Sequence, residues 1–184
     1  MAERIILLNG TSSAGKTTIA RALQYALEPR WLFLGFDEFV GMLTDSAPGP
    51  TDGASDLELD RWLAEAWYRT VAGLVSAGFD VIVEDIILES YRLDAALRLL
   101  APLDVTFVAV RCPLDVAVQR ERDRGDRDIG LVVRQFELVH ADRIYDCEID
   151  TTTLAPQTCV AAIREIVEDG GVRAFDEMSR TRGT

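Results

Sequence analysis

The sequence predicts an α/β fold in which a mainly parallel sheet of five strands is flanked by helices. Short apolar runs alternate along the chain with stretches whose apolar residues recur every three or four positions. Most of the runs are continuous, which is typical of strands that are covered on both faces. The 184 residues suit one domain, since domains commonly span roughly 100–200 residues. We expect this domain at 1–169, followed by a C-terminal tail, partly ordered at most, at 170–184.

Each candidate strand is an apolar run that ends at polar or turn-forming residues. The runs are Arg4–Leu8, Trp31–Gly35, Asp80–Glu84, Val105–Val110 and Asp146–Ile149. Between them, apolar residues at i, i+4, i+7 and i+8 predict amphipathic helices, the longest of which covers 59–75. The same spacing predicts helices over 19–27 and 159–167. Pro113 suits the first turn of a further helix that runs towards Arg122.

Acidic residues outnumber basic ones, and this imbalance argues against several kinds of partner. The chain has 31 Asp and Glu against 19 Lys and Arg, a net charge of −12. Binding to nucleic acid or anionic lipid depends on Lys and Arg at phosphates, so we expect neither. No apolar stretch approaches the ~20 residues of a membrane span, and the N-terminal run is too short for a secretory signal. Cys112, Cys147 and Cys159 suit reduced thiols, so we expect a cytoplasmic protein.

The strongest motif is Gly10-Thr11-Ser12-Ser13-Ala14-Gly15-Lys16-Thr17, which matches the Walker A pattern G-x-x-x-x-G-K-[ST]. A predicted strand precedes it and a predicted helix follows it, a context that disfavours a chance match. The glycines let backbone N–H groups converge on phosphate oxygens, and the helix adds its positive end. Lys16, the only lysine, would reach the β- and γ-phosphates, and the Thr17 hydroxyl would ligate Mg²⁺.

With this motif, the sequence predicts a particular α/β fold, the three-layer sandwich of P-loop NTPases. The expected cofactors are ATP and Mg²⁺, although the sequence encodes no clear choice between ATP and GTP. We expect the nucleotide to contact residues 10–17 together with Thr18, and the sequence leaves open whether the chain forms a homo-oligomer.

Two acidic residues follow predicted strands at the edge where open α/β sheets bind ligands. Asp37 follows the second strand, and a carboxylate there can accept the proton of a hydroxyl that attacks the γ-phosphate. Asp85 follows the third strand and is our candidate for holding Mg²⁺ or its water shell, or for contacting the acceptor. The neighbouring Glu84 is the open alternative for Mg²⁺. For either aspartate, the structural alternative is to cap the following helix.

Arginines cluster between 120 and 134, interleaved with acidic residues and interrupted by Gly125. We expect a small arginine lid that closes over the triphosphate and neutralises charge in the transition state. Arg124 and Arg127 flank the glycine and are the candidate catalytic arginines, and Arg120 is a candidate nucleotide contact. The alternative is a solvated helix end whose ion pairs contribute little.

No basic residue occurs between Arg30 and Arg61, although seven acidic residues do. A kinase with an anionic acceptor usually needs arginine in this region, so the segment favours a neutral or cationic hydroxyl acceptor. Arg69, Arg92 or Arg61 itself could still reach the acceptor. The turn-rich stretch 44–56 predicts a long loop that is either mobile or a substrate lid.

Further short segments, spread over residues 4 to about 152, add a pattern beyond the generic phosphate loop. They are Ile6–Gly10 running into Ser12–Lys16, Gly35–Asp37, Val110–Cys112, Arg124–Arg127, and Val139-His140 through Tyr145-Asp146 to Asp150–Thr152. Together they resemble chloramphenicol phosphotransferase and its relatives in the P-loop kinase superfamily. The resemblance implies transfer of the γ-phosphate of ATP to a hydroxyl of the antibiotic, with Asp37 as the base.

We therefore expect a Mg-ATP-dependent phosphotransferase with a small, uncharged hydroxyl acceptor, such as chloramphenicol or a related antibiotic. A nucleoside, nucleotide or metabolite kinase of similar fold is one alternative. A nucleotide-binding regulatory or toxin-like protein is another. His140, the only histidine, is assigned no chemistry.

Overall fold

The computed structural model describes residues 3–27, 31–43, 55–124, 130–170 and 173–183. Within them, five parallel strands form one sheet in the order β2-β3-β1-β4-β5. The strands are β1 (Arg4–Asn9), β2 (Trp31–Gly35), β3 (Asp80–Asp85), β4 (Asp104–Arg111) and β5 (Cys147–Asp150). The predicted α/β fold with a parallel five-stranded sheet is confirmed, and each strand bound lies within one residue of its prediction.

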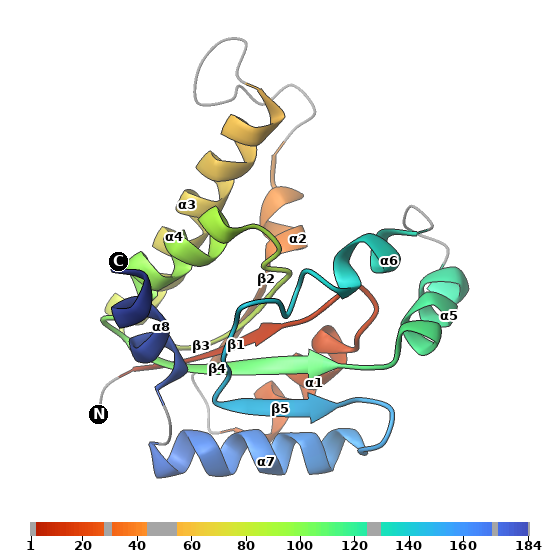
Figure 1. The fold of residues 1–184 in the computed structure, drawn as a ribbon. Helices are drawn as coiled ribbons and strands as arrows, with labels where there is room; N and C mark the ends of the chain where they lie inside the picture. The colour runs from red at the N-terminus through yellow and green to blue at the C-terminus, as the bar shows by residue number, and fades with distance from the viewer. Residues whose placement is uncertain (1–2, 28–30, 44–54, 125–129, 171–172, 184) are drawn as a thin grey trace.

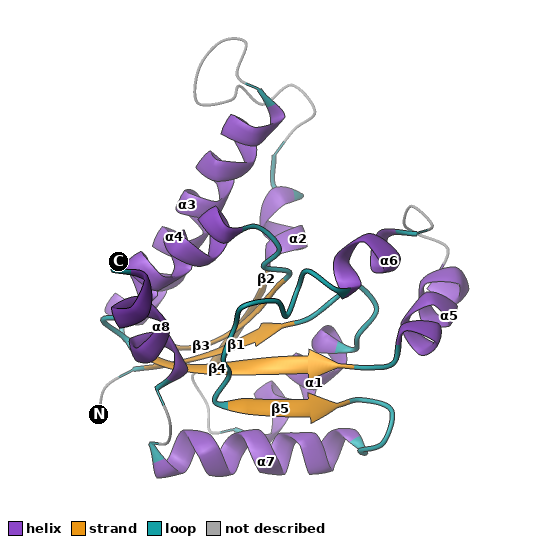
Figure 2. Ribbon diagram, viewed as in Figure 1, coloured by secondary structure: helices purple, strands orange, loops and turns teal. Residues whose placement is uncertain are grey.

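Helices cover both faces of this sheet, which gives three layers (Figures 1 and 2). The helices are α1 (Lys16–Ala26), α2 (Phe36–Val40), α3 (Asp56–Ser76), α4 (Ser90–Leu100), α5 (Leu114–Arg124), α6 (Leu131–Phe136), α7 (Pro156–Asp169) and α8 (Ala174–Arg182). Figure 1 shows α1 and α7 on one side of the strands and α3, α4 and α8 on the other. Among the described residues, no helix combines the length and apolar character that crossing a membrane requires.

The central strand β1 supplies side chains to both halves of the core. Ile5 and Leu7 pack in the cluster that holds α3, α4 and α8, whereas Ile6 and Leu8 pack in the cluster that holds α1 and α7. All four are fully buried. A strand whose successive side chains point to opposite faces must be apolar throughout when both faces are covered. This is why the run is continuous in the sequence.

Four helices, α2, α4, α6 and α8, lie where our sequence analysis gave no helix bounds. Helix α4 covers Ser90–Leu100, and α8 lies inside the segment 170–184 that we expected to be a tail. Phe175 of α8 packs edge-on against Phe107 of β4, with ring centroids 5.1 Å apart. The Asp146 carboxylate accepts hydrogen bonds of 2.8 Å from the backbone N–H groups of both Phe107 and Ala174. Helix α8 therefore packs on the sheet, while a domain boundary at 169 stays a prediction.

Candidate active site

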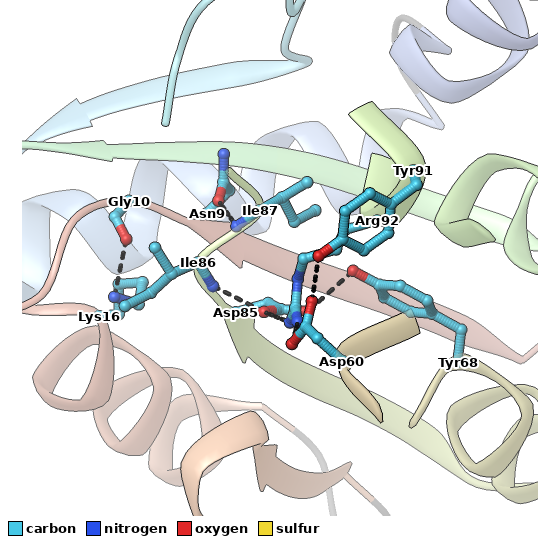
Figure 3. A network of polar contacts seen from close by, with 10 residues as sticks. All are labelled: Asn9, Gly10, Lys16, Asp60, Tyr68, Asp85, Ile86, Ile87, Tyr91 and Arg92. Carbon is cyan, nitrogen blue, oxygen red and sulfur yellow. Dashed lines mark hydrogen bonds and ion pairs between the residues drawn. The ribbon is translucent and has the colours of Figure 1, made fainter. Parts of the chain in front are cut away.

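The Walker A segment forms the turn between β1 and α1, and two glycines make its shape possible. Gly15 has φ +96° and is the N-cap residue of α1. A Cβ on Gly10 would lie 2.3 Å from the carbonyl oxygen of Val110, so no larger residue fits. The Lys16 Nζ donates to the carbonyl oxygens of Gly10 and Thr11, both at 2.9 Å. Figure 3 shows the first of these bonds, which holds the ammonium group against the loop.

Asn9 anchors the start of this loop to two other segments. Its Nδ2 donates to the Val139 carbonyl oxygen and to the Tyr145 hydroxyl, both at 2.8 Å. Its Oδ1 accepts from the backbone N–H of Ile87 at 2.9 Å (Figure 3). Asn9 is fully buried, and each of these bonds satisfies a polar group that burial would otherwise penalise.

His140 lies beside the same tyrosine. Its Nδ1 is 2.9 Å from the Tyr145 hydroxyl oxygen. Burial first, and neighbouring arginines to a smaller extent, lower the pKa of His140 to about 4. The imidazole is therefore neutral at pH 7.

Thr17 and Glu84 form the part of the site that suits Mg²⁺. The Thr17 hydroxyl donates to the Glu84 carboxylate, with oxygen distances of 2.9 and 3.0 Å. Burial raises the pKa of Glu84, while nearby Lys16 lowers it. Among the described residues, no group of three or more His, Cys, Asp or Glu side chains could hold a metal ion. A hydroxyl and a carboxylate suit Mg²⁺, which kinases hold by one or two protein groups and the nucleotide phosphates.

Asp85 has other partners. Its Oδ1 accepts from the backbone N–H of Ile86 at 2.7 Å and from Arg92 Nη2 at 3.0 Å, and its Oδ2 accepts from the Tyr68 hydroxyl at 2.8 Å. Since neighbouring side chains of a strand point to opposite faces, Glu84 lies by the phosphate loop and Asp85 turns towards α3 and α4. The Mg²⁺ role of Asp85 stays a prediction, and the geometry favours Glu84.

A cavity of about 970 Å³ opens beside the phosphate loop. Of the residues that the sequence analysis selected, the cavity lining includes Ser12, Ser13, Gly15, Lys16, Thr17, Thr18, Asp37, Asp85, Arg120 and Arg124. Gly10, Thr11 and Ala14 belong to the loop without being part of this lining. The structure therefore brings the candidate base and the candidate nucleotide contacts to a single cavity.

Asp37 is the second residue of α2 and lies on the cavity wall beside Phe36. The N-cap residue of α2 is Gly35, so Asp37 does not occupy the capping position that was its structural alternative. The Phe36 ring packs edge-on against Trp67, with centroids 5.7 Å apart, which fixes the first turn of α2 against α3.

Of the candidate arginines, the structure describes Arg120 and Arg124, which line the cavity with the phosphate loop. Arg120 donates to the Thr151 hydroxyl at 3.0 Å and to the Thr151 carbonyl oxygen at 3.3 Å. Arg124 is exposed, ends α5 and lines the cavity. Arg127 and Gly125 lie outside the described residues, so the arginine lid stays a prediction.

A residue that sequence reasoning missed is Gln135 of α6. It is only 5% exposed, and its Oε1 accepts from the backbone N–H of Ser12 at 2.8 Å. Glu121 connects α6 to α5, because its carboxylate accepts from the N–H groups of Gly130 and Val132 at 2.8 and 2.9 Å. These two backbone bonds also lower the pKa of Glu121. One glutamine in a short helix carries no sequence signal for such a contact.

On the other side of the loop, Arg92 of α4 joins three elements (Figure 3). Its guanidinium pairs with Asp60 of α3 and with Asp85 of β3, each at 3.0 Å, and lies 4.2 Å from the centroid of the Phe36 ring. The Tyr91 hydroxyl also donates to Asp60. Of the three arginines that could have reached the acceptor, Arg92 alone belongs to the cavity lining.

The two remaining arginines have other contacts. Arg61 lies 4.6 Å from the centroid of the Tyr91 ring, and Arg69 pairs with Glu65 on the exposed face of α3. The described acceptor side of the cavity, beyond the phosphate loop towards α3 and α4, therefore carries one cation, Arg92, which two carboxylates already neutralise.

A Walker A loop at the carboxyl edge of a parallel sheet defines a P-loop nucleotide-binding protein. Solved structures show the same fold. One is the APS kinase CysC of Mycobacterium tuberculosis in complex with AMPPNP and APS, with a TM-score of 0.67, 14% identity, and coverage of 91% of this chain and 98% of that one. Another is shikimate kinase from Acinetobacter baumannii in complex with shikimate, with a TM-score of 0.62, 16% identity and coverage of 91% and 94%.

The chain belongs to the chloramphenicol phosphotransferase-like protein family, which matches residues 3–168. Over 169 residues it is 32% identical to a Mycobacterium tuberculosis protein named "Putative O-phosphotransferase Rv2636", covering 81% of this chain and 75% of that relative. The family resemblance, the P-loop fold and the phosphotransferase class with a hydroxyl as acceptor group are thus confirmed.

Proposed function

We propose that this enzyme transfers the γ-phosphate of Mg-ATP to a hydroxyl of a small, uncharged acceptor. The observation that carries the proposal is the single cavity whose lining brings Lys16, Thr17 and Asp37 together. In such a cavity a hydroxyl beside Asp37 faces the terminal phosphate of a nucleotide held by the loop. Phosphoryl transfer needs positioning and charge stabilisation above all, and both are available there.

Each residue has a defined role in this proposal. Lys16 and the backbone N–H groups of the phosphate loop hold the β- and γ-phosphates, with Thr18 at the loop end of α1. Thr17, with Glu84 or Asp85, holds Mg²⁺ or its water shell, and Mg²⁺ when bound neutralises charge on the phosphates. Asp37 takes the proton from the acceptor hydroxyl.

The arginines act on the other side of the phosphate groups. Arg120 contacts the nucleotide, while Arg124 and Arg127 neutralise the charge that develops during transfer. The proposed use of ATP and the three free thiols suit a cytoplasmic enzyme. The thiols are those of Cys112, Cys147 and Cys159.

The lining of the acceptor side supports an uncharged acceptor. Phe36, Leu57, Leu88 and Tyr91 supply apolar surface, and the guanidinium of Arg92 is already paired. Among the described residues of this side, an acceptor with a carboxylate or phosphate would meet Asp37 and Asp60, and the cation there, Arg92, is already paired. Chloramphenicol or a related neutral antibiotic, the acceptor that the family name suggests, fits this lining.

The test is transfer of ³²P from [γ-³²P]ATP to a panel of neutral, cationic and anionic alcohols that includes chloramphenicol. With the best acceptor, Asp37→Asn should lower kcat by about 10²–10⁴-fold, the usual contribution of a general base, with little change in ATP affinity. Glu38→Gln, the same loss of charge one residue along, is the control and should retain activity. Unchanged turnover in Asp37→Asn would refute the base assignment, and preferred transfer to an anionic alcohol would refute the uncharged acceptor.

A further inference from the structure

The Arg92–Asp60 ion pair lies in the wall of the acceptor side of the cavity. Arg92 is 4% exposed, and both of its partners line the cavity with it. Its Nη1 donates to Asp60 Oδ1 and its Nη2 donates to Asp85 Oδ1, both at 3.0 Å. Within the part of the chain that the structure describes, the buried Arg92 Nε has no hydrogen-bond partner. The guanidinium therefore keeps donor capacity, although its charge is neutralised.

The two carboxylates differ in what they do for the fold. The Asp85 side chain is completely buried and also accepts from the Tyr68 hydroxyl, so it needs Arg92 as a counter-ion. The Asp60 side chain is 36% exposed and lies on α3, whose first turn borders the cavity. Asp60 is therefore not needed to neutralise Asp85, yet it occupies the Nη1 donor of Arg92.

We infer that Asp60 selects against anionic acceptors. It does so by holding the guanidinium of Arg92, which would otherwise bind an anionic group. An arginine with a free pair of N–H donors is the preferred protein partner of carboxylate, sulfate and phosphate groups. With Asp60 in place, such a group would have to displace a carboxylate from Arg92 and would lie next to that carboxylate afterwards. Asp60 is thus a specificity-determining residue that acts by excluding the wrong acceptors.

This inference rests on the proposed function, since it concerns the acceptor side of the same site. Its consequence can nevertheless be measured without transfer. Replacing Asp60 by asparagine keeps the size of the side chain and leaves the Arg92–Asp85 pair intact. The replacement removes one of the two carboxylates that pair with Arg92, next to the place where the acceptor binds, so the variant should acquire affinity for anions.

The probe is inorganic sulfate, titrated by calorimetry into protein whose phosphate loop is filled with Mg²⁺ and AMPPNP. We expect Asp60→Asn to bind sulfate at least about tenfold more tightly than the wild type, because hydrogen bonds to charged groups contribute about 1.5–3 kcal/mol. Asp56→Asn is the matched control. Asp56 lies one turn earlier on α3 and lines the same cavity, so this variant changes the net charge equally while leaving the Arg92–Asp60 pair in place.

A second variant tests whether the gain passes through Arg92. Arg92→Lys in the Asp60→Asn background keeps a positive charge for Asp85 but offers no second pair of donors, so the gain in sulfate affinity should disappear. Asp60→Ala serves in place of Asp60→Asn if the latter does not give a native circular dichroism spectrum.

Equal sulfate affinity in the wild type and Asp60→Asn would overturn the inference. An equal gain in Asp56→Asn would also overturn it, since net charge alone would then explain the result. These outcomes are separate from failure of the proposed function. That function fails when the wild-type enzyme transfers phosphate to no neutral alcohol, whatever the variants do with sulfate.

Discussion

The Thr17 hydroxyl donates to the carboxylate of Glu84, with oxygen distances of 2.9 and 3.0 Å. This bond joins the first turn of α1 to the end of β3, two elements that are far apart in the sequence. The two groups that suit Mg²⁺ are thus already side by side, one on the helix that follows β1 and one on the adjacent strand β3. Preorganisation of this kind reduces the cost of ordering the site when the nucleotide and its metal arrive.

Replacing Glu84 by glutamine should weaken Mg²⁺-dependent nucleotide binding. We expect the Mg²⁺ concentration required for half-maximal ATP binding to rise about 10- to 100-fold, the usual effect of losing a group that orients a metal site. Titration of Mg²⁺ into protein and a fluorescent ATP analogue measures this. Glu89→Gln, which removes another carboxylate of the cavity lining, is the control. An unchanged Mg²⁺ requirement in Glu84→Gln would argue for Asp85 instead.

The same substitution should leave the free energy of unfolding unchanged or increase it at pH 7. Burial raises the pKa of Glu84, so the folded state holds its proton more tightly than the unfolded state does. Ionisation at higher pH then favours the unfolded state, and this cost is present above the folded pKa. Glutamine carries no charge, so the variant does not have the cost of ionising a buried carboxyl group. Urea unfolding at pH 7 tests the expectation, and a marked loss of stability would contradict it.

Two arginines of α4 should differ sharply in their contribution to stability. Arg92→Met leaves the Asp85 carboxylate buried without its counter-ion, which should cost about 3–5 kcal/mol. Arg98→Ala removes an exposed pair with Glu65 and should cost less than about 1 kcal/mol. Urea denaturation of both variants gives the comparison. Similar losses in the two would mean that the Arg92 network does not stabilise the fold.

Stability should fall as the pH is lowered from about 6.5 towards 4, and His140 should account for part of the fall. The folded pKa of His140 is lowered to about 4 from an ordinary value near 6.5, mainly by burial. Between these values the unfolded state binds a proton that the folded state does not, so acid favours unfolding. His140→Gln should show a shallower dependence in urea unfolding at several pH values. Parallel curves for wild type and variant would refute this assignment.

Replacement by alanine should be harmful at one glycine and stabilising at another. At Gly10 the new Cβ would lie 2.3 Å from the Val110 carbonyl oxygen, so the phosphate loop must move and ATP affinity should fall at least about tenfold. At Gly73, inside α3, nothing lies within 4 Å of the Cβ position. Gly73→Ala should therefore raise stability by about 0.5–1 kcal/mol and leave ATP binding intact. Calorimetric binding and thermal unfolding test both, and normal ATP binding by Gly10→Ala would contradict the close packing.

The sheet and the phosphate loop could be predicted from the sequence because both depend on local patterns of residues. Continuous apolar runs such as Ile5–Leu8 predict strands that are buried on both faces, and the loop is defined by consecutive residues. The ion-pair network on the acceptor side of the cavity could not be predicted in this way. Asp60, Asp85 and Arg92 come from three elements, and each residue in isolation suits a solvent-exposed position. Their pairing depends on how α3 and α4 pack on β3, which no local pattern encodes.

The same reasoning explains two smaller omissions. Gln135 contacts Ser12 only because α6 folds back over the phosphate loop, although more than a hundred residues separate them along the chain. Helix α8 is short and mostly polar, and its apolar residues, among them Phe175 and Met178, are too few to establish a period.

The three hydrogen bonds of Asn9 join parts of the candidate active site that come from three different segments of the chain. They tie the end of β1 to Ile87 and to the segment that holds Val139 and Tyr145. We therefore expect these parts to form a rigid frame that keeps its shape during turnover. Adjustment to different acceptors must come from the helices beyond this frame, and relatives with other acceptors should differ there first.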